Sequence, residues 1–158
     1  MTTILCVGKS RERYFSDAVA EYVKRLSTLA PCRVVEVDDE PEPKQLTDAT
    51  IEKTLRREGE RLLARIPPQA HVVALCVDAK QPSSEELAAR LNALMLAGRS
   101  DVVFVIGGSL GLHADVLRRA DERMGMSRMT FPHQLARVML AEQLYRAAKI
   151  NAHQRYHK

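Results

Sequence analysis

The chain has 158 residues, of which 46% are hydrophobic and 28% are charged, and its formal net charge at pH 7 is +4. This composition is typical of one globular domain with a sizeable core, and no run approaches the roughly 20 apolar residues that cross a bilayer. The opening stretch MTTILCVGKSRER lacks the length and the basic region of a signal peptide. We therefore expect a single domain over residues 1–158, located in the cytoplasm and away from membranes.

The first half of the chain alternates two strands with two helices. A short β-branched run predicts a strand at 3–7, and apolar residues at helical spacing predict a helix at 14–30. A strand at 33–37 and an acidic, proline-broken loop come next, followed by a capped helix at 48–66.

The second half continues the alternation. We expect an apolar strand at 71–77, a helix with a Ser cap and a terminal Gly at 83–98, and a fully apolar strand at 102–106. A short helix at 112–124 and a brief strand at 124–127 precede the last helix.

Pro132 opens that last helix, which is expected at 133–149. The order of elements, with central strands that are apolar on both faces, predicts an α/β fold: a mostly parallel sheet with helices on both faces. Ligands of such sheets bind beyond the carboxyl ends of the strands. The strand ends at 77–78, 106–108 and 126–127 therefore form the candidate binding site.

The three cysteines are odd in number and match no metal-binding spacing. Cys6 and Cys76 lie in apolar runs, where a free thiol behaves as a small hydrophobic side chain. We expect both to be reduced and buried, and we expect neither a disulfide nor a metal site.

The positive charge is concentrated near the C-terminus. Residues 128–158 hold six Lys or Arg residues and one acidic residue, so this fifth of the chain carries the whole positive excess. Such asymmetry indicates a surface that faces a polyanion. A solvated helix face followed by a basic tail is the alternative that the charge pattern leaves open.

The stretch DVVFVIGGSLGL reads as a buried strand that stops at two glycines, Gly107 and Gly108. It lacks the Lys of a phosphate-binding loop and the G-x-G-x-x-G order of a dinucleotide-binding loop. The glycines then either let backbone approach a ligand or form a tight turn that packing requires. The turn alone leaves both interpretations open.

The loop from Met126 to Phe131 is largely apolar and precedes the last helix. Together with Leu75, its side chains Met129 and Phe131 could sandwich a flat heterocycle whose edge is recognised by backbone groups. The strand-end loops hold no cluster of lysines for a triphosphate. The pocket therefore suits a nucleoside better than a nucleotide.

The last helix carries apolar residues on more than one stripe, including Leu135, Val138, Met139 and Leu144. One side of the helix can pack on the core, and the other indicates a homodimer interface. Complete burial of the helix within its own subunit is the alternative.

Three stretches, FVIGGSLGL, MSRMTFPHQLARVMLAEQLYRAAKI and the terminal YHK, resemble the RlmH family of ribosomal RNA methyltransferases, and the resemblance covers essentially the whole chain. These are SPOUT-class enzymes, whose cofactor is S-adenosylmethionine. The resemblance implies a C-terminal trefoil knot over about 71–150, an exception to unknotted topology. By position, it places the adenosine contacts on Leu75, Gly107, Gly108, Met126, Ser127, Arg128, Met129, Thr130 and Phe131.

The resemblance also implies the substrate. Members of the family methylate N3 of a pseudouridine in helix 69 of 23S rRNA on the assembled ribosome, and they act as homodimers. The basic tail at 151–158 of one subunit would complete the site of the other, and no DNA partner is implied. Two positions depart from the family pattern: Ala79 stands where a Gly is expected, and the segment 151–155 lacks a glycine.

Methyl transfer to this ring nitrogen requires the N3 proton to leave, and imidazole has a pKa near working pH. His157 is the first candidate for the general base, assisted by Arg137 and Tyr156. The candidates for substrate contacts are His133, Arg155 and Lys158.

Each of the three residues placed in catalysis has a simpler interpretation. His157 could only contact a phosphate, Arg137 could form a salt bridge with Glu142 of the partner subunit, and Tyr156 could only pack the tail. Two other functions also stay open: a catalytically silent ribosome-binding protein of SPOUT fold, and a different nucleotide-binding α/β protein that uses the glycine turn for phosphate.

Overall fold

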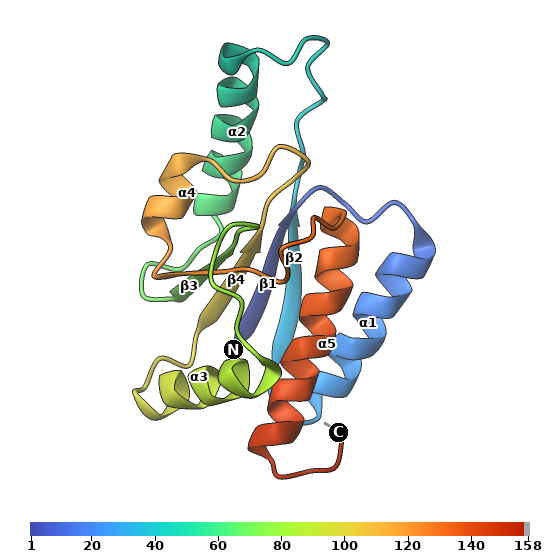
Figure 1. Ribbon diagram of the computed structural model, residues 1–158, viewed down its shortest axis with the longest axis vertical. Helices are drawn as coiled ribbons and strands as arrows, with labels where there is room; N and C mark the ends of the chain where they lie inside the picture. Colours follow the sequence, from blue (N-terminus) through green and yellow to red (C-terminus); the bar gives the residue numbers. More distant parts are fainter. Residues whose placement is uncertain (157–158) are drawn as a thin grey trace.

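The computed structural model describes residues 1–156, and within them one parallel sheet forms the centre of the molecule (Figure 1). The strand order is β2-β1-β4-β3-β5, and every neighbouring pair is parallel. All carboxyl ends of the strands therefore meet at one edge of the sheet. The strands are β1 (Thr2–Val7), β2 (Cys32–Val37), β3 (His71–Leu75), β4 (Val102–Ile106) and β5 (Glu122–Met124).

Helices cover both faces of this sheet, which confirms the predicted architecture (Figure 1). Three of them, α1, α3 and α5, pack on one face, while α2 and α4 pack on the other. Both α2 and α3 begin with capping boxes, built on Thr47 and Ser83. The helices are α1 (Arg13–Ser27), α2 (Asp48–Leu63), α3 (Ser84–Leu96), α4 (Ala114–Arg119) and α5 (His133–Asn151).

The alternation of side chains along β1 shows how the two layers of core arise. Ile4 and Cys6 point to the cluster that contains Leu140 of α5, whereas Leu5 points to the cluster that contains Leu62 of α2. All of these side chains are at most 1% exposed. Strands that are buried on both faces need apolar residues at every position, which is the pattern that the sequence shows.

The prediction for residues 112–127 is wrong in its boundaries. The helix there is limited to α4, and the strand is β5, which precedes the expected 124–127. The Asp121 carboxylate accepts the backbone N–H of Val72 at 2.8 Å, and Glu122 lies 2.8 Å from the buried imidazole of His71. These long-range partners fix the segment beside β3 as a strand, although its local sequence favours a helix.

The chain that leaves β5 runs in close contact with the loop between β3 and α3. The Gly125 N–H donates to the Lys80 carbonyl at 2.9 Å, and a Cβ on Gly125 would lie 2.6 Å from the Ala79 carbonyl oxygen. Only glycine allows this approach. The contact is compatible with the expected trefoil knot, which stays a prediction. Ala79 itself adopts no positive φ, so its departure from the family pattern introduces no backbone strain.

No helix within residues 1–156 combines the length and the hydropathy that a membrane span requires.

Candidate active site

A cleft of about 670 Å³ opens at the carboxyl ends of β3 and β4, between the loops that follow β3, β4 and β5. Its volume lies within the range of about 300–1,000 Å³ that is common for small-molecule sites. The lining residues are Leu75, Cys76, Val77, Ile106, Gly107, Gly108, Ser109, Leu110, Gly111, Leu112, Met126, Ser127, Met129, Thr130, Phe131, Pro132, His133 and Ala136.

The structure brings together nearly all of the residues that were expected to hold the cofactor. Eight of the nine line the cleft, and the exception is Arg128, which is exposed outside it. His133, which was expected to contact the substrate, lines the cleft as well. The sequence interpretation missed the residues that flank these positions in the same loops, among them Cys76 and Val77. Cys76 is half-buried here rather than buried, because it lies just beyond β3 on the wall of the cleft.

The glycine turn after β4 has a structural reason of its own. A Cβ on Gly107 would overlap the carbonyl oxygen of Gly111, and the Gly111 N–H donates to the Gly108 carbonyl at 3.1 Å. Gly111 has a φ of +93°, a conformation that other residues rarely adopt. The turn is therefore required by packing, and the same tight turn presents bare backbone to the cleft.

The loop from Met126 to Phe131 forms the opposite wall. The Ser127 hydroxyl accepts the N–H of Met129 at 3.0 Å, which turns the chain sharply before α5. Met129 is 72% exposed at the mouth of the cleft, whereas Phe131 is half-buried. Within residues 1–156, no group of three His, Cys, Asp or Glu side chains is placed to hold a metal ion. The walls are thus mainly apolar side chains and backbone, a setting that suits a flat heterocycle, and the polar side chains among them are those of Ser109, Ser127, Thr130 and His133.

Arg137 is buried and holds β1 and β2 against α5. Its side chain is 2% exposed, and one terminal nitrogen donates to the carbonyls of Val7 (2.6 Å) and Gly8 (2.8 Å). The other donates to Glu36 at 2.9 Å, and Nε lacks a hydrogen-bond partner among the described residues. Within its own chain Arg137 pairs with Glu36, and the alternative of a salt bridge with Glu142 of the partner subunit stays a prediction. A catalytic role for Arg137 stays a prediction, and its burial favours a positioning role.

The tail folds back onto α5 of its own chain. His153 has a φ of 53°, which reverses the chain after the helix. The Tyr156 hydroxyl donates to Glu142 at 3.1 Å, its ring meets Tyr145 edge-on at 4.8 Å, and the Arg146 guanidinium lies 4.8 Å from the ring centre. Burial and the Glu142 carboxylate raise the pKa of Tyr156. Arg155 is exposed, and His157 and Lys158 lie outside the described residues.

Comparison with known proteins decides the family. A family model described as "Predicted SPOUT methyltransferase" matches residues 1–157. The chain belongs to the SPOUT methyltransferase family. Two curated relatives, each named "Ribosomal RNA large subunit methyltransferase H", align over 156 residues, which is 99% of this chain and 98% of each relative. The relative from Exiguobacterium sp. (strain ATCC BAA-1283 / AT1b) is 49% identical, and that from Exiguobacterium sibiricum is 47% identical.

A solved structure supports the fold assignment. The probable methylase family protein from Haemophilus influenzae Rd KW20 aligns with a TM-score of 0.54 at 12% identity, covering 99% of this chain and 70% of that one. At this identity the likeness concerns the fold alone. As a SPOUT methyltransferase, the protein is an enzyme that uses S-adenosylmethionine as its methyl donor. The apolar cleft, with bare backbone at its glycine turn, fits the nucleoside part of that molecule.

His133 gives this SPOUT cleft a titratable side chain. It is the first residue of α5, and it is half-buried. Burial and the positive charge of Arg137 lower the pKa of His133 below its ordinary value of 6.5. The imidazole is therefore neutral at pH 7 and can accept a hydrogen bond or a proton in the cleft.

We expect replacement of His133 by Gln to reduce the acid sensitivity of the fold. The unfolded chain protonates this imidazole as pH falls through 6.5, whereas the folded chain resists protonation until a lower pH. The contribution of His133 to the free energy of unfolding is therefore fully present above pH 6.5 and falls as the pH drops below that value. Urea unfolding at pH 7.5 and pH 5.5 measures the effect: the loss of unfolding free energy between the two values should be smaller in His133→Gln than in the wild type. An equal loss in both proteins would contradict the assignment.

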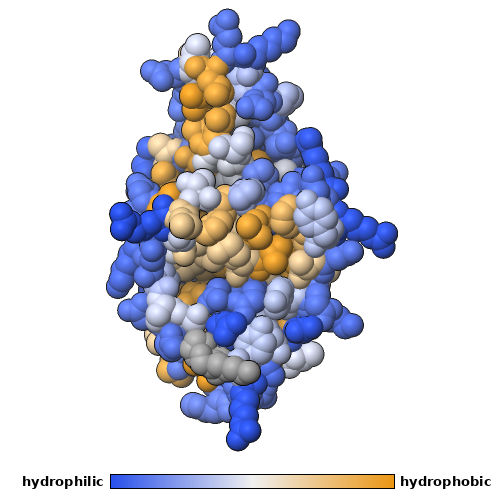
Figure 2. All heavy atoms as spheres, turned by 45° about the vertical axis from the view of Figure 1, so that its right-hand side comes forward, coloured by the Kyte–Doolittle hydropathy of each residue, from blue (hydrophilic) through white to orange (hydrophobic). Residues whose placement is uncertain are grey.

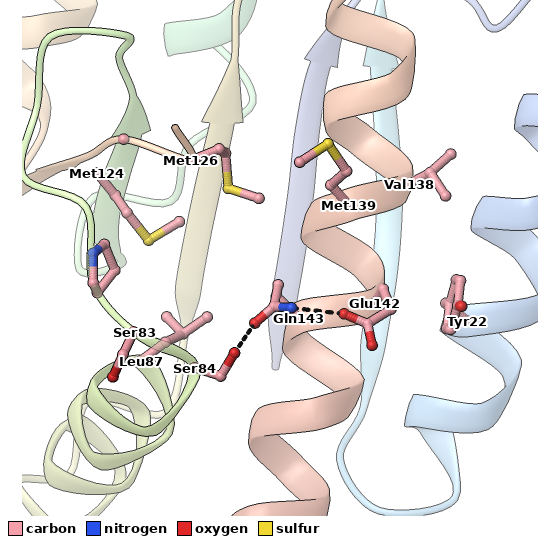
Figure 3. A pocket seen from close by; sticks show the side chains of 12 residues that line it. Tyr22, Ser83, Ser84, Leu87, Met124, Met126, Val138, Met139, Glu142 and Gln143 are labelled. Carbon is pink, nitrogen blue, oxygen red and sulfur yellow. Dashed lines mark hydrogen bonds between the residues drawn. The ribbon is translucent and has the colours of Figure 1, made fainter. Parts of the chain in front are cut away.

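A second cleft, of about 480 Å³, lies between α5, α1 and the loop before α3 (Figure 3). Met126 and Met139 point toward one another across it, whereas Val138 projects from the other side of α5, toward α1. Figure 2, which turns this side of the molecule forward, shows apolar side chains gathered across the middle of the face. This face of the SPOUT domain therefore leaves the second apolar stripe of α5 only partly covered, since Val138 and Met139 are half-buried.

Proposed function

We propose that this protein transfers a methyl group from S-adenosylmethionine to N3 of a pseudouridine in helix 69 of 23S rRNA, acting on the assembled ribosome. The observation that carries the proposal is the near full-length identity to proteins named "Ribosomal RNA large subunit methyltransferase H", together with the loops that form the cleft. Such a function also places the protein in the cytoplasm, where ribosomes are.

The protein contributes to methyl transfer mainly by positioning the two reactants. When bound, S-adenosylmethionine supplies an electrophilic methyl group on a sulfonium. The glycine turn and the loop from Met126 to Phe131 would hold the nucleoside between backbone on one side and apolar side chains on the other. Fixing two reactants in line can supply roughly 7–11 kcal/mol of the barrier, so the protein needs little further chemistry of its own.

Removal of the N3 proton is the remaining requirement. The tail imidazole of His157 is our first candidate for the base, and Arg155 and Lys158 would bind the RNA beside it. His133 lines the cleft with a neutral imidazole and would contact the substrate there. Tyr156, now packed on α5, would stack on the target base once the tail engages RNA.

The position of the tail favours a homodimer in which each tail serves the other subunit. Tyr156 is hydrogen-bonded to Glu142, which lies six residues beyond Ala136, the last residue of α5 that lines the cleft. At about 1.5 Å per residue, this is roughly 9 Å along the helix from the cleft wall. The partly covered apolar stripe of α5 supports the same arrangement, because pairing two such stripes would bury both. A two-fold dimer would then bring one tail to the cleft of its partner.

The experiment that tests the function is methylation of purified ribosomes that lack this modification. We expect S-adenosylmethionine with a labelled methyl group to label helix 69 in assembled ribosomes and to label free 23S rRNA poorly. The physical reason is the small, short basic region, which gives little affinity for naked RNA without the shape of the ribosome. Mass spectrometry of helix 69 fragments locates the methyl group.

Two results would contradict the proposal in different ways. Cofactor binding with no methyl transfer to ribosomes would identify a catalytically silent ribosome-binding protein. Equal rates on ribosomes and free rRNA would remove the requirement for the assembled particle.

A further inference from the structure

The segment that follows β1, together with the first two residues of α1, carries an exposed cluster of cations and aromatic surface near the cleft. We call residues 8–14 the basic loop. The side chains of Arg11 and Arg13 are 79% and 92% exposed, and Tyr14 is 68% exposed. Every other aromatic side chain within residues 1–156 is at least partly buried. An exposed ring beside two guanidinium groups is available to stack on a base.

The base of this loop is held firmly by buried groups. Arg137 donates to the carbonyls of Val7 and Gly8, where the loop begins. The backbone N–H of Ser10 donates to Glu36 at 3.0 Å, and the Ser10 hydroxyl donates to the Gln134 side chain at 3.1 Å. The loop is therefore fixed to β2 and to the first turn of α5, while its tip stays open.

This anchoring places the basic loop at the rim of the cofactor cleft. Gln134 directly follows His133, which lines the cleft. On the sheet, the side chain of Val7 lies 3.3 Å from where a Cβ of Gly108 would be, so the loop starts beside the glycine turn. Figure 1 shows the connection between β1 and α1 passing next to the first turn of α5.

The tip residues are engaged only in weak contacts within the chain. Arg11 lies 3.7 Å from Asp39, and Arg13 lies 3.5 Å from Asp17; all four side chains are more than half exposed. Exposed ion pairs of this kind contribute between about 0 and 1 kcal/mol, so a phosphate can replace the carboxylate at little cost. The ring of Tyr14 is tilted against Phe15, with centroids 4.6 Å apart, and its outer face is open.

We propose that the basic loop is a second RNA-contact surface of this protein, in addition to the C-terminal tail. Arg11 and Arg13 would contact phosphates beside the target nucleotide, and Tyr14 would stack on an unpaired base. Guanidinium groups and an open aromatic ring are the side chains that bind single-stranded and looped RNA. The inference rests on the proposed function, since it assumes that the RNA enters from this rim.

The test compares two double variants and a single one. Arg11→Ala with Arg13→Ala removes the cations, and Tyr14→Ala removes the ring. The matched control is Arg56→Ala with Arg118→Ala, because these arginines are 61% and 72% exposed and also pair with carboxylates, but lie on α2 and α4 on the other face of the sheet. Binding of each protein, loaded with S-adenosylhomocysteine, to purified ribosomes is measured at several salt concentrations.

We expect the arginine variant to show a shallower fall of log K for ribosome binding with log salt concentration. The magnitude of the slope should decrease by about 0.7–0.9 for each lost phosphate contact. Tyr14→Ala should weaken ribosome binding about tenfold, because stacking on one base is lost. Calorimetry should find the affinity for S-adenosylmethionine unchanged in both, and the control should bind ribosomes like the wild type.

Three outcomes separate the possible failures. If the loop variants and the control bind ribosomes equally, the basic loop does not contact RNA. If the loop variants change the oligomeric state in analytical ultracentrifugation, the loop belongs to a subunit interface instead, which also overturns the inference. If the wild type binds ribosomes without methylating them, the proposed function fails, while the binding comparison still decides the role of the loop.

Discussion

Replacement of Gly107 by Ala is expected to lower the affinity for S-adenosylmethionine by about 10- to 100-fold. The added Cβ would overlap the Gly111 carbonyl oxygen, and because this neighbour is backbone, no side-chain rotation can relieve the collision. The turn must open, at a cost of about 1–3 kcal/mol, and the wall of the cleft moves with it. Isothermal titration calorimetry measures the affinity, and circular dichroism checks that the variant is folded.

Gly98→Ala is the matched control for this prediction. Gly98 has a φ of +76° and open space around the position of its Cβ, and it lies outside the cleft. Its replacement should destabilise the fold by about 1 kcal/mol through backbone strain while leaving cofactor affinity unchanged. Wild-type affinity in Gly107→Ala would show that the turn does not form the cofactor wall.

His157→Ala is expected to reduce methyl transfer by about 10²- to 10⁴-fold, the usual contribution of a general base. Cofactor binding should be unaffected, because within residues 1–156 the walls of the cleft come from residues 75–136. Single-turnover methylation of ribosomes measures the rate, and calorimetry measures the binding. Wild-type turnover in this variant would remove His157 from the mechanism and leave water or His133 as the proton acceptor.

Mixing these two variants, at an S-adenosylmethionine concentration too low to load Gly107→Ala, tests whether the tail of one subunit serves the other. If Gly107→Ala and His157→Ala subunits exchange freely, half of the dimers are mixed, and each of these has one cleft and one tail intact in the same composite site. We expect about a quarter of the wild-type activity to return. Absence of recovery after verified subunit exchange would place each tail at the cleft of its own chain.

Several parts of the site were predictable from local sequence. The uncharged, β-branched runs of β1, β3 and β4 fixed strands that are buried on both faces, and a parallel sheet brings their carboxyl ends to one edge. The glycines after β4 and the apolar loop from Met126 to Phe131 marked that edge, and all but one of the expected cofactor residues line the cleft there. Local signals sufficed because each of these loops directly follows the strand that positions it.

Other parts depended on partners that are remote in the sequence. The segment before Gly125 has a helical pattern, yet Asp121 and Glu122 bond to the start of β3 and make it a strand. The direction of the tail could not be predicted from local sequence either, because it is set by the contact of Tyr156 with Glu142.

The amino-acid sequence by itself determined strands β1 to β4, the four long helices around them and the three loops that form the cleft, because strand and helix periodicity and glycine turns act over a few residues. Tertiary structure alone decided what Arg137 does. In sequence it is one more cation in a basic region, but its partners are the carbonyls at the end of β1, 129 and 130 residues away, and the carboxylate of Glu36. A buried guanidinium is stable only where such acceptors surround it, and the folded chain is what assembles them.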